Sequence, residues 1–286
     1  MTNVTNANQG GVVSWLKLAP NPTTGSDQIM IGLHDAGSDL NTFIWSGTAW
    51  SAVHTEHSLG LENAAVEMDF DITFETHSSN PNDAWLVWSD GATVSRKLWD
   101  GGTSAWAAAT TMGDDNAAVL LNAHPNNGAV LAAVYEDDTS VTDDIREAHL
   151  TAGSQTWSAI AQIWAGPVRR NIGITRMAQA TQKYNSSNEG MLVYTTEEST
   201  TYPQYRRWTG SSWSSPTSAS GTNGELRHMV LKTSPKRDEA VLVTLGNNGR
   251  VEAQIWNGTT SSWGSVSALC TTADVNVDRD LQSLYR

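Results

Sequence analysis

The sequence predicts an all-β protein in which one small antiparallel sheet is repeated five times. The first observation is a recurring turn in which two tryptophans flank a glycine, seen most fully in residues 255–263, Ile-Trp-Asn-Gly-Thr-Thr-Ser-Ser-Trp. The second is composition, because 13 Trp, 23 Gly and only 16% charged residues favour strands and turns over helices. The third is that no long stretch shows the 3.6-residue apolar spacing of an amphipathic helix.

The tryptophan turn recurs with a period close to fifty residues. Trp45–Trp50, Trp99–Trp106 and Trp208–Trp213 are further copies, and in the copy that ends at Trp157 the first tryptophan is replaced by Leu150. The second tryptophans lie at positions 50, 106, 157, 213 and 263, so the steps between them are 56, 51, 56 and 50 residues. A repeat of this length is typical of a supersecondary unit that stacks on its neighbours to bury a core.

The last repeat shows the expected strands most clearly. Residues 225–235, 239–245, 250–256 and 263–270 read as four short strands. The second and third are joined by Gly246-Asn-Asn-Gly249, a hairpin turn rich in residues that accept positive φ. Four such strands joined by tight turns form an antiparallel meander.

The other repeats fit the same template. Their strands are expected at 11–20, 27–34, 40–45 and 50–57, then at 65–77, 84–88, 93–99 and 106–112, then at 117–125, 130–136, 144–150 and 157–164, and then at 170–182, 191–195, 202–208 and 213–218. The repeats are therefore expected at about 11–60, 61–114, 115–166, 167–221 and 222–274, with an N-terminal tail at 1–10 and a C-terminal tail at 275–286.

A single four-stranded sheet cannot bury both of its apolar faces, so it is unstable alone. Repeated around an axis, each sheet covers the faces of its neighbours. The sequence therefore predicts a five-bladed β-propeller of four-stranded antiparallel blades, with an open row of sheets or a sandwich as alternatives. Residues 275–286 resemble the opening strand of a further repeat. A surplus C-terminal strand is thus expected, free to pair with an edge of its own molecule or of a second copy.

Charge, hydropathy and cysteine content restrict the partners. The chain carries 17 basic and 30 acidic residues, a net charge of −13, and this field disfavours binding to nucleic acid or to an anionic membrane. No apolar run approaches the ~20 residues of a transmembrane helix, and the N-terminus lacks the basic and apolar regions of a signal peptide, so no membrane insertion is expected. The single cysteine, Cys270, excludes an intrachain disulfide, and its apolar neighbours predict a buried thiol.

The tryptophan pair suggests both a packing role and a binding role. Two indoles at a hairpin end can cover the boundary between adjacent sheets, while glycine lets the chain reverse. An exposed indole is also a platform for the apolar face of a sugar ring, whose hydroxyls neighbouring polar groups can bind. Because residues two apart on a strand share a face, polar side chains two positions before the first tryptophan lie beside it. The candidate ligand-binding residues are Lys97, Trp99, Tyr205, Arg206, Trp208, Gln254 and Trp256.

The chain resembles the lectin-type β-propellers of fungi and bacteria, whose blades each carry a Trp-x-Gly-x-x-Trp-like turn. Trp45-Ser-Gly-Thr-Ala-Trp50 and Trp208-Thr-Gly-Ser-Ser-Trp213 carry this resemblance. It implies that sugars bind between adjacent blades and that the protein is a non-enzymatic recognition or assembly module. A glycan or other surface ligand is then the expected partner. The repeats rich in Trp, Gly and Thr and the acidic charge indicate a location that is extracellular or at a cell or particle surface.

Two functions of other classes stay open. A structural subunit would use the surplus strand to link copies into an oligomer or fibre. A propeller glycoside hydrolase would use a carboxylate pair such as Asp69 and Asp71, which share a strand face. No catalytic residue, metal site or cofactor is predicted, because the acidic segment 136–144 has no calcium-loop pattern and the histidines have no metal-binding spacing.

Overall fold

The computed structural model describes residues 13–23, 25–35, 39–57, 69–77, 79–90, 92–114, 118–125, 127–135, 144–166, 177–182, 189–196, 199–234 and 236–272. In this part of the chain the regular structure is β throughout, and the strands form five antiparallel sheets in which neighbours pair in chain order. The expected tails 1–10 and 275–286 and the acidic segment 136–143 lie outside the described residues.

The five sheets are numbered in chain order. Sheet 1 contains β1 (Val13–Pro20), β2 (Ile29–Asp35), β3 (Leu40–Trp45) and β4 (His54–His57). Sheet 2 contains β5 (Phe70–Phe74), β6 (Ala84–Ser89), β7 (Thr93–Asp100), β8 (Ala105–Trp106) and β9 (Thr110–Asp114). Sheet 3 contains β10 (Ala118–Ala123), β11 (Val130–Tyr135), β12 (Asp144–Leu150) and β13 (Ala161–Ala165). Sheet 4 contains β14 (Met177–Gln182), β15 (Gly190–Thr196), β16 (Ser199–Trp208) and β17 (Thr217–Ser218). Sheet 5 contains β18 (Leu226–Thr233), β19 (Glu239–Gly246), β20 (Val251–Asn257), β21 (Ser262–Trp263) and β22 (Ser267–Cys270).

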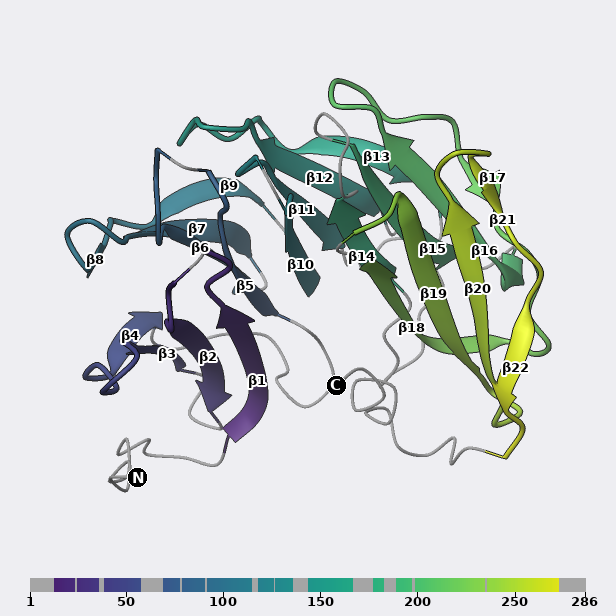
Figure 1. The fold of residues 1–286 in the computed structure, drawn as a ribbon, viewed down its shortest axis with the longest axis horizontal. Coiled ribbons are helices and arrows are strands. Elements are labelled where there is room, and N and C mark those ends of the chain that lie inside the picture. Colours follow the sequence, from purple (N-terminus) through teal and green to yellow (C-terminus); the bar gives the residue numbers. More distant parts are fainter. Residues whose placement is uncertain are drawn as a thin grey trace.

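The sheets follow one another along an arc, with sheet 1 and sheet 5 at its two ends (Figure 1). The first strand of each sheet lies on the inner side of the arc, where β1 contacts β5, β5 contacts β10, β10 contacts β14 and β14 contacts β18. This radial succession of small antiparallel sheets is the arrangement of a β-propeller.

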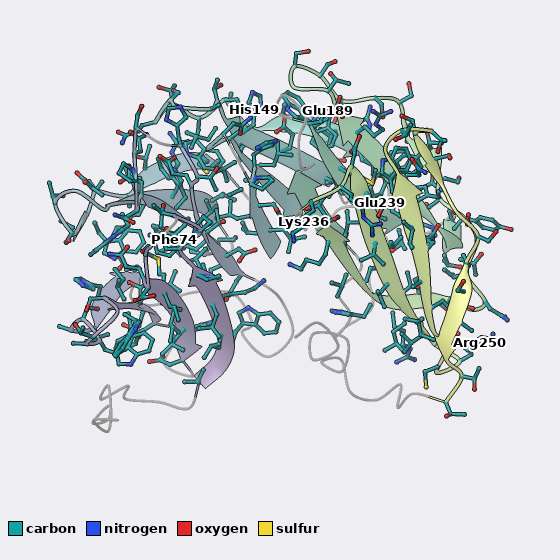
Figure 2. The ribbon with its side chains drawn as sticks, viewed as in Figure 1. Phe74, His149, Glu189, Lys236, Glu239 and Arg250 are labelled. Carbon is teal, nitrogen blue, oxygen red and sulfur yellow. The ribbon has the colours of Figure 1, made fainter. Side chains whose placement is uncertain are left out.

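The hydrophobic core lies between successive sheets, where side chains fill the spaces (Figure 2). Strand β6 shows why: its six residues are all buried. Leu86 and Trp88 pack with sheet 1, whereas Trp85 and Val87 pack with sheet 3. A strand covered on both faces reads as a continuous apolar run, and Ala-Trp-Leu-Val-Trp-Ser is such a run.

The predicted fourth strand is interrupted in every repeat. The second tryptophan pairs with the end of the third strand in a bridge of one or two residues, and pairing resumes only at β4, β9, β13, β17 or β22. The residue after the second tryptophan donates its amide to the carbonyl of the residue before the first, in Ser51–Ile44, Ala107–Leu98, Ser158–His149, Ser214–Arg207 and Gly264–Ile255, at 2.8–2.9 Å.

In three repeats a serine hydroxyl completes the hydrogen bonds at the interruption. The hydroxyl oxygens of Ser51, Ser158 and Ser214 accept the amide that precedes the first tryptophan, at 3.0, 3.1 and 3.0 Å. Each hydroxyl also donates to the carbonyl of the next residue. A side chain thus takes the bond that a backbone carbonyl of a continuous fourth strand would make.

The prediction for the cysteine is wrong. Cys270 is exposed at the end of β22, and the neighbouring Leu269 is 60% exposed. β22 is a short outer strand that pairs with β20 on one side, so its apolar residues do not enter a core cluster.

Candidate functional site

Side chains of the third strands point alternately toward the two neighbouring sheets. On β7, Lys97 and Trp99 face sheet 1, whereas Arg96 faces sheet 3 and lies over the ring of Trp157, 5.8 Å from its centroid. The boundary between two successive sheets, called a seam below, therefore receives residues from the third strands of both sheets. This alternation follows from the two-residue period of a strand.

The seam between sheets 1 and 2 contains a desolvated ion pair. Lys97 Nζ lies 2.9 Å from Glu56 Oε2, and the side chains are 17% and 2% exposed. Thr42 Oγ1 donates to Glu56 Oε1 at 2.6 Å, which fixes the carboxylate. The His54 ring lies edge-on to Trp99 with 6.0 Å between centroids. A polar cluster thus lies directly beside an indole.

The seam between sheets 3 and 4 places a histidine against an indole. The rings of His149 and Trp208 are 4.6 Å apart, and His149 Nδ1 lies 3.4 Å from both carboxylate oxygens of Glu147. Arg206 lies on the Trp208 side of β16 as predicted from the spacing, and its Nε donates to the Ser214 carbonyl at 2.6 Å. Acidic, basic and aromatic groups therefore meet at this seam.

The seam between sheets 4 and 5 places a phenol against two indoles. The Tyr205 ring lies 5.4 Å from Trp256 and 6.0 Å from Trp263, in edge-on arrangements. The Arg207 guanidinium lies over Trp256, 5.5 Å from its centroid, and its Nη1 donates to Ser261 Oγ at 3.2 Å. Burial raises the pKa of the Tyr205 phenol, so this group stays protonated at neutral pH.

Gln254 connects this seam to the segment after β17. Its Oε1 accepts the Ser220 amide at 3.0 Å, and its Nε2 donates to the Ser220 carbonyl at 3.2 Å. The side chain is 2% exposed, so both ends of the amide are used within the protein. Gln254 therefore holds sheet 5 against sheet 4.

The seven residues predicted to bind ligand all lie at these seams, but their exposure differs. The first tryptophans Trp99, Trp208 and Trp256 are 4%, 4% and 1% exposed. Their second partners keep more accessible surface, since Trp106, Trp213 and Trp263 are only half-buried. Four further residues lie at the seams but were not predicted from the sequence spacing: Glu56, His149, Arg207 and Trp263.

The aspartates considered as a carboxylate pair have different partners. Asp69 Oδ2 lies 2.8 Å from His34 Nδ1 in a fully buried contact between sheets 2 and 1, and burial raises the pKa of the Asp69 carboxyl. Asp71 Oδ1 lies 3.5 Å from Lys17 Nζ, and Asp71 Oδ2 accepts the amide of Leu121 at 3.0 Å. Each carboxylate thus joins neighbouring sheets.

Within the described ranges, no group of three or more His, Cys, Asp and Glu side chains is placed to hold a metal ion. In the same part of the chain there is no helix with the length and apolar character needed to cross a membrane.

Comparison with known proteins identifies structural neighbours. No protein-family model matches the chain, and no curated protein sequence is similar to it. A lectin of Burkholderia pseudomallei, BP39L, is similar with a TM-score of 0.66 and 11% identity over 88% of this chain and 69% of its own. A six-bladed fucose-recognising lectin of Aleuria aurantia is similar with a TM-score of 0.56 and 14% identity over 92% and 81%. The Hadza microbial sialidase Hz136 has a TM-score of 0.52 and 10% identity over 90% and 58%. The chain therefore shares the fold of β-propeller lectins, and the resemblance predicted from its sequence is confirmed at the level of fold.

Proposed function

We propose that the chain is a non-enzymatic β-propeller module that binds carbohydrate at the seams between its sheets. The seam of sheets 4 and 5 carries the proposal, because Tyr205 lies edge-on to the half-buried indole of Trp263 there and Arg207 lies over the neighbouring indole of Trp256. An indole contacts the apolar face of a sugar ring, while guanidinium and hydroxyl groups bond its hydroxyls. The lectin neighbours, one of which recognises fucose, support this ligand class.

Arg207 is the central residue of the proposed site. A guanidinium offers five N–H donors in a fixed plane, which suits the paired hydroxyls of a sugar. Its bond to Ser261 and its stacking on Trp256 hold that plane, and an ion pair with Glu189 at 3.8 Å adds a third restraint. Because 28% of the Arg207 side chain remains exposed, donors of the guanidinium can reach a ligand in solvent.

The other seams supply further sites of the same kind. In this proposal each of the five sheets is one blade, with the boundaries expected from the repeats. Lys97 and Glu56 form the polar group at one seam, and His149 and Glu147 form it at another. Several weak sites on one rigid body would give avidity for surfaces that display many glycans, which fits a role outside the cell or at its surface.

A glycan array followed by titration with a binding glycan tests the proposal. Arg207→Met keeps most of the aliphatic stem and removes the hydrogen-bond donors. The affinity of this seam for the glycan is therefore expected to fall about 10- to 100-fold, which corresponds to the free energy of one hydrogen bond to a charged group. Arg237→Met is the matched control, because the Arg237 side chain is 73% exposed on a turn of sheet 5. A wild-type chain that binds no glycan, or an Arg207 variant that binds like the control, would refute the proposal.

A further inference from the structure

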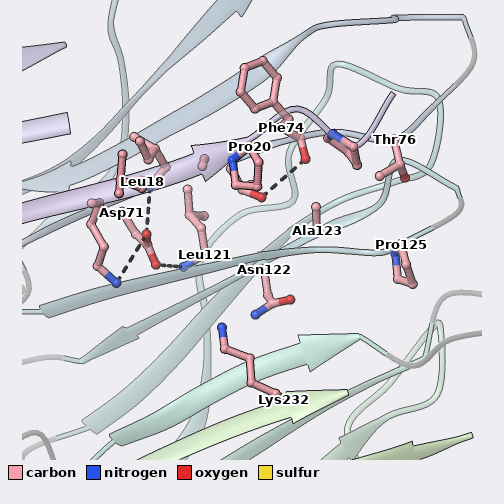
Figure 3. A pocket seen from close by; sticks show the side chains of 15 residues that line it. Leu18, Pro20, Asp71, Phe74, Thr76, Leu121, Asn122, Ala123, Pro125 and Lys232 are labelled. Carbon is pink, nitrogen blue, oxygen red and sulfur yellow. Dashed lines mark hydrogen bonds and ion pairs between the residues drawn. The ribbon is translucent and has the colours of Figure 1, made fainter. Parts of the chain in front are cut away.

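A cavity of about 320 Å³ lies at the inner side of the arc, away from the tryptophan turns. Its wall includes Lys17 of β1, Asp71 of β5, Asn122 of β10 and Lys232 of β18, so four different sheets contribute to it (Figure 3). The volume is at the lower end of the range for small-molecule sites, enough for a ligand of the size of one sugar.

The carboxylate in the cavity is already satisfied by the protein. Asp71 Oδ1 accepts the amide of Ile72 at 2.9 Å and lies 3.5 Å from Lys17 Nζ. Asp71 Oδ2 accepts the amide of Leu121 at 3.0 Å. These contacts hold the carboxylate against the wall, and the ion pair with Lys17 balances its charge (Figure 3).

Lys232 adds a second positive charge that this ion pair does not balance. Its side chain keeps an exposed surface inside the cavity and extends toward β10, where Asn122 lies (Figure 3). Among the described residues its ammonium has no hydrogen-bond partner. The surrounding sheets still desolvate it: burial lowers the pKa of Lys232, with Asp71 acting to raise it and Lys17 acting to lower it.

Among the described residues that line the cavity, the three charged groups sum to one net positive charge, in a chain whose net charge is −13. An anion placed between the two ammonium groups would relieve their mutual repulsion and would complete the hydrogen bonds of Lys232. The neighbouring Asn122 amide can serve an uncharged oxygen of the same ligand.

We propose that this inner cavity binds a small organic carboxylate, no larger than a single acidic sugar, between Lys17 and Lys232. The proposal does not depend on glycan binding at the seams, because none of the described residues that line the cavity belongs to the proposed glycan sites. The carboxylate would accept hydrogen bonds from Lys232 and Lys17, and the remaining oxygens would lie toward Asn122.

Calorimetric titration of the whole chain with D-glucuronate at low ionic strength tests this site. Wild type is expected to bind D-glucuronate and not D-glucose, which lacks the carboxylate. Lys232→Met is expected to weaken glucuronate binding at least tenfold, whereas Lys232→Arg is expected to keep most of it. Lys236→Met is the control, since Lys236 is an exposed lysine that does not line the cavity.

Two results would overturn the proposal: no binding of glucuronate to wild type, or equal binding to wild type and Lys232→Met. Thermal melting of each variant checks that the fold is intact. Lys17 is not substituted, because its removal would leave the buried Asp71 carboxylate without its cation and would destabilise the sheets themselves.

Discussion

Gly47 and Gly210, the glycines of the two shortest tryptophan turns, have φ of +96° and +92°, a region that side chains other than hydrogen rarely adopt. In the longer turn of sheet 5 the positive φ, +50°, is at Ser261 instead. Gly258 of that turn meets a different constraint, because a Cβ there would collide with the carboxyl group of Asp238 unless that side chain moved. The sequence predicts a glycine in each turn, but the physical constraint that the glycine meets differs between turns, and Gly153 of a longer turn again has a positive φ of +69°.

Gly47→Ala is expected to cost about 1–2 kcal/mol of unfolding free energy, the penalty of a left-handed conformation with a Cβ. The new Cβ would also lie 3.2 Å from Cβ of Asp27. Gly264→Ala is the control, because its nearest neighbour would be an ordinary 3.5 Å away and Ala107 occupies the equivalent position in sheet 2. Urea unfolding of both variants measures the difference, and equal losses would show that backbone strain is not the cause.

At the scale of elements, the second and third strands could be predicted to within two residues at each end, except that β16, expected at 202–208, begins at Ser199. The third strands expected at 40–45 and 144–150 are Leu40–Trp45 and Asp144–Leu150. Most residues of both strands are buried, and each strand is bounded by turn residues that the sequence marks clearly. The fourth strand, expected at 157–164, begins only at Ala161. A serine after the second tryptophan takes the local amide, and a hydroxyl that competes with the backbone leaves no periodic pattern in a sequence.

Ser214→Ala tests this account of the interrupted strand. The Arg207 amide would lose the acceptor that Ser214 Oγ provides at 3.0 Å, at a cost of about 1 kcal/mol in unfolding free energy. Ser215→Ala is the matched control, since Ser215 is exposed and contributes only its carbonyl to the same motif. Urea unfolding compares the two, and an Ser214 variant as stable as the control would mean that water replaces the hydroxyl without cost.

At the scale of the whole molecule, the radial arrangement could be predicted because each sheet needs a neighbour on both faces. The location of the site residues at the seams could be predicted as well, since residues two apart share a face. The solvent exposure of these residues could not be predicted from the sequence. Whether Trp256 or Trp263 reaches solvent depends on how closely sheets 4 and 5 approach, and the packing of two distant segments is not encoded in the spacing of either one.

The inner side of the arc also determines how stability should depend on pH. His228 of β18 is 5% exposed, and neither ring nitrogen has a hydrogen-bond partner among the described residues. Burial, assisted by the charge of Lys17, lowers the pKa of His228 to about 4. Below the ordinary histidine pKa of ~6.5, the His228 imidazole binds a proton in the unfolded chain but stays neutral in the folded chain. The stability that this histidine confers is therefore complete above ~6.5 and is lost as the pH falls toward 4.

With a His228 pKa of about 4 in the folded chain and ~6.5 in the unfolded chain, the unfolding free energy falls by about 2 kcal/mol between pH 7.5 and pH 5. Each unit of pKa difference corresponds to about 1.4 kcal/mol. Urea unfolding of wild type and His228→Leu at both pH values measures it, and the variant should lose about 2 kcal/mol less than wild type. Buried acids such as Asp69, whose pKa burial raises, act in the opposite direction, but they are the same in both proteins and cancel in the comparison. An identical pH dependence in the two proteins would mean that β18 opens enough in the folded chain for His228 to bind a proton. Water would then reach the inner side of the arc more readily than the packing there indicates.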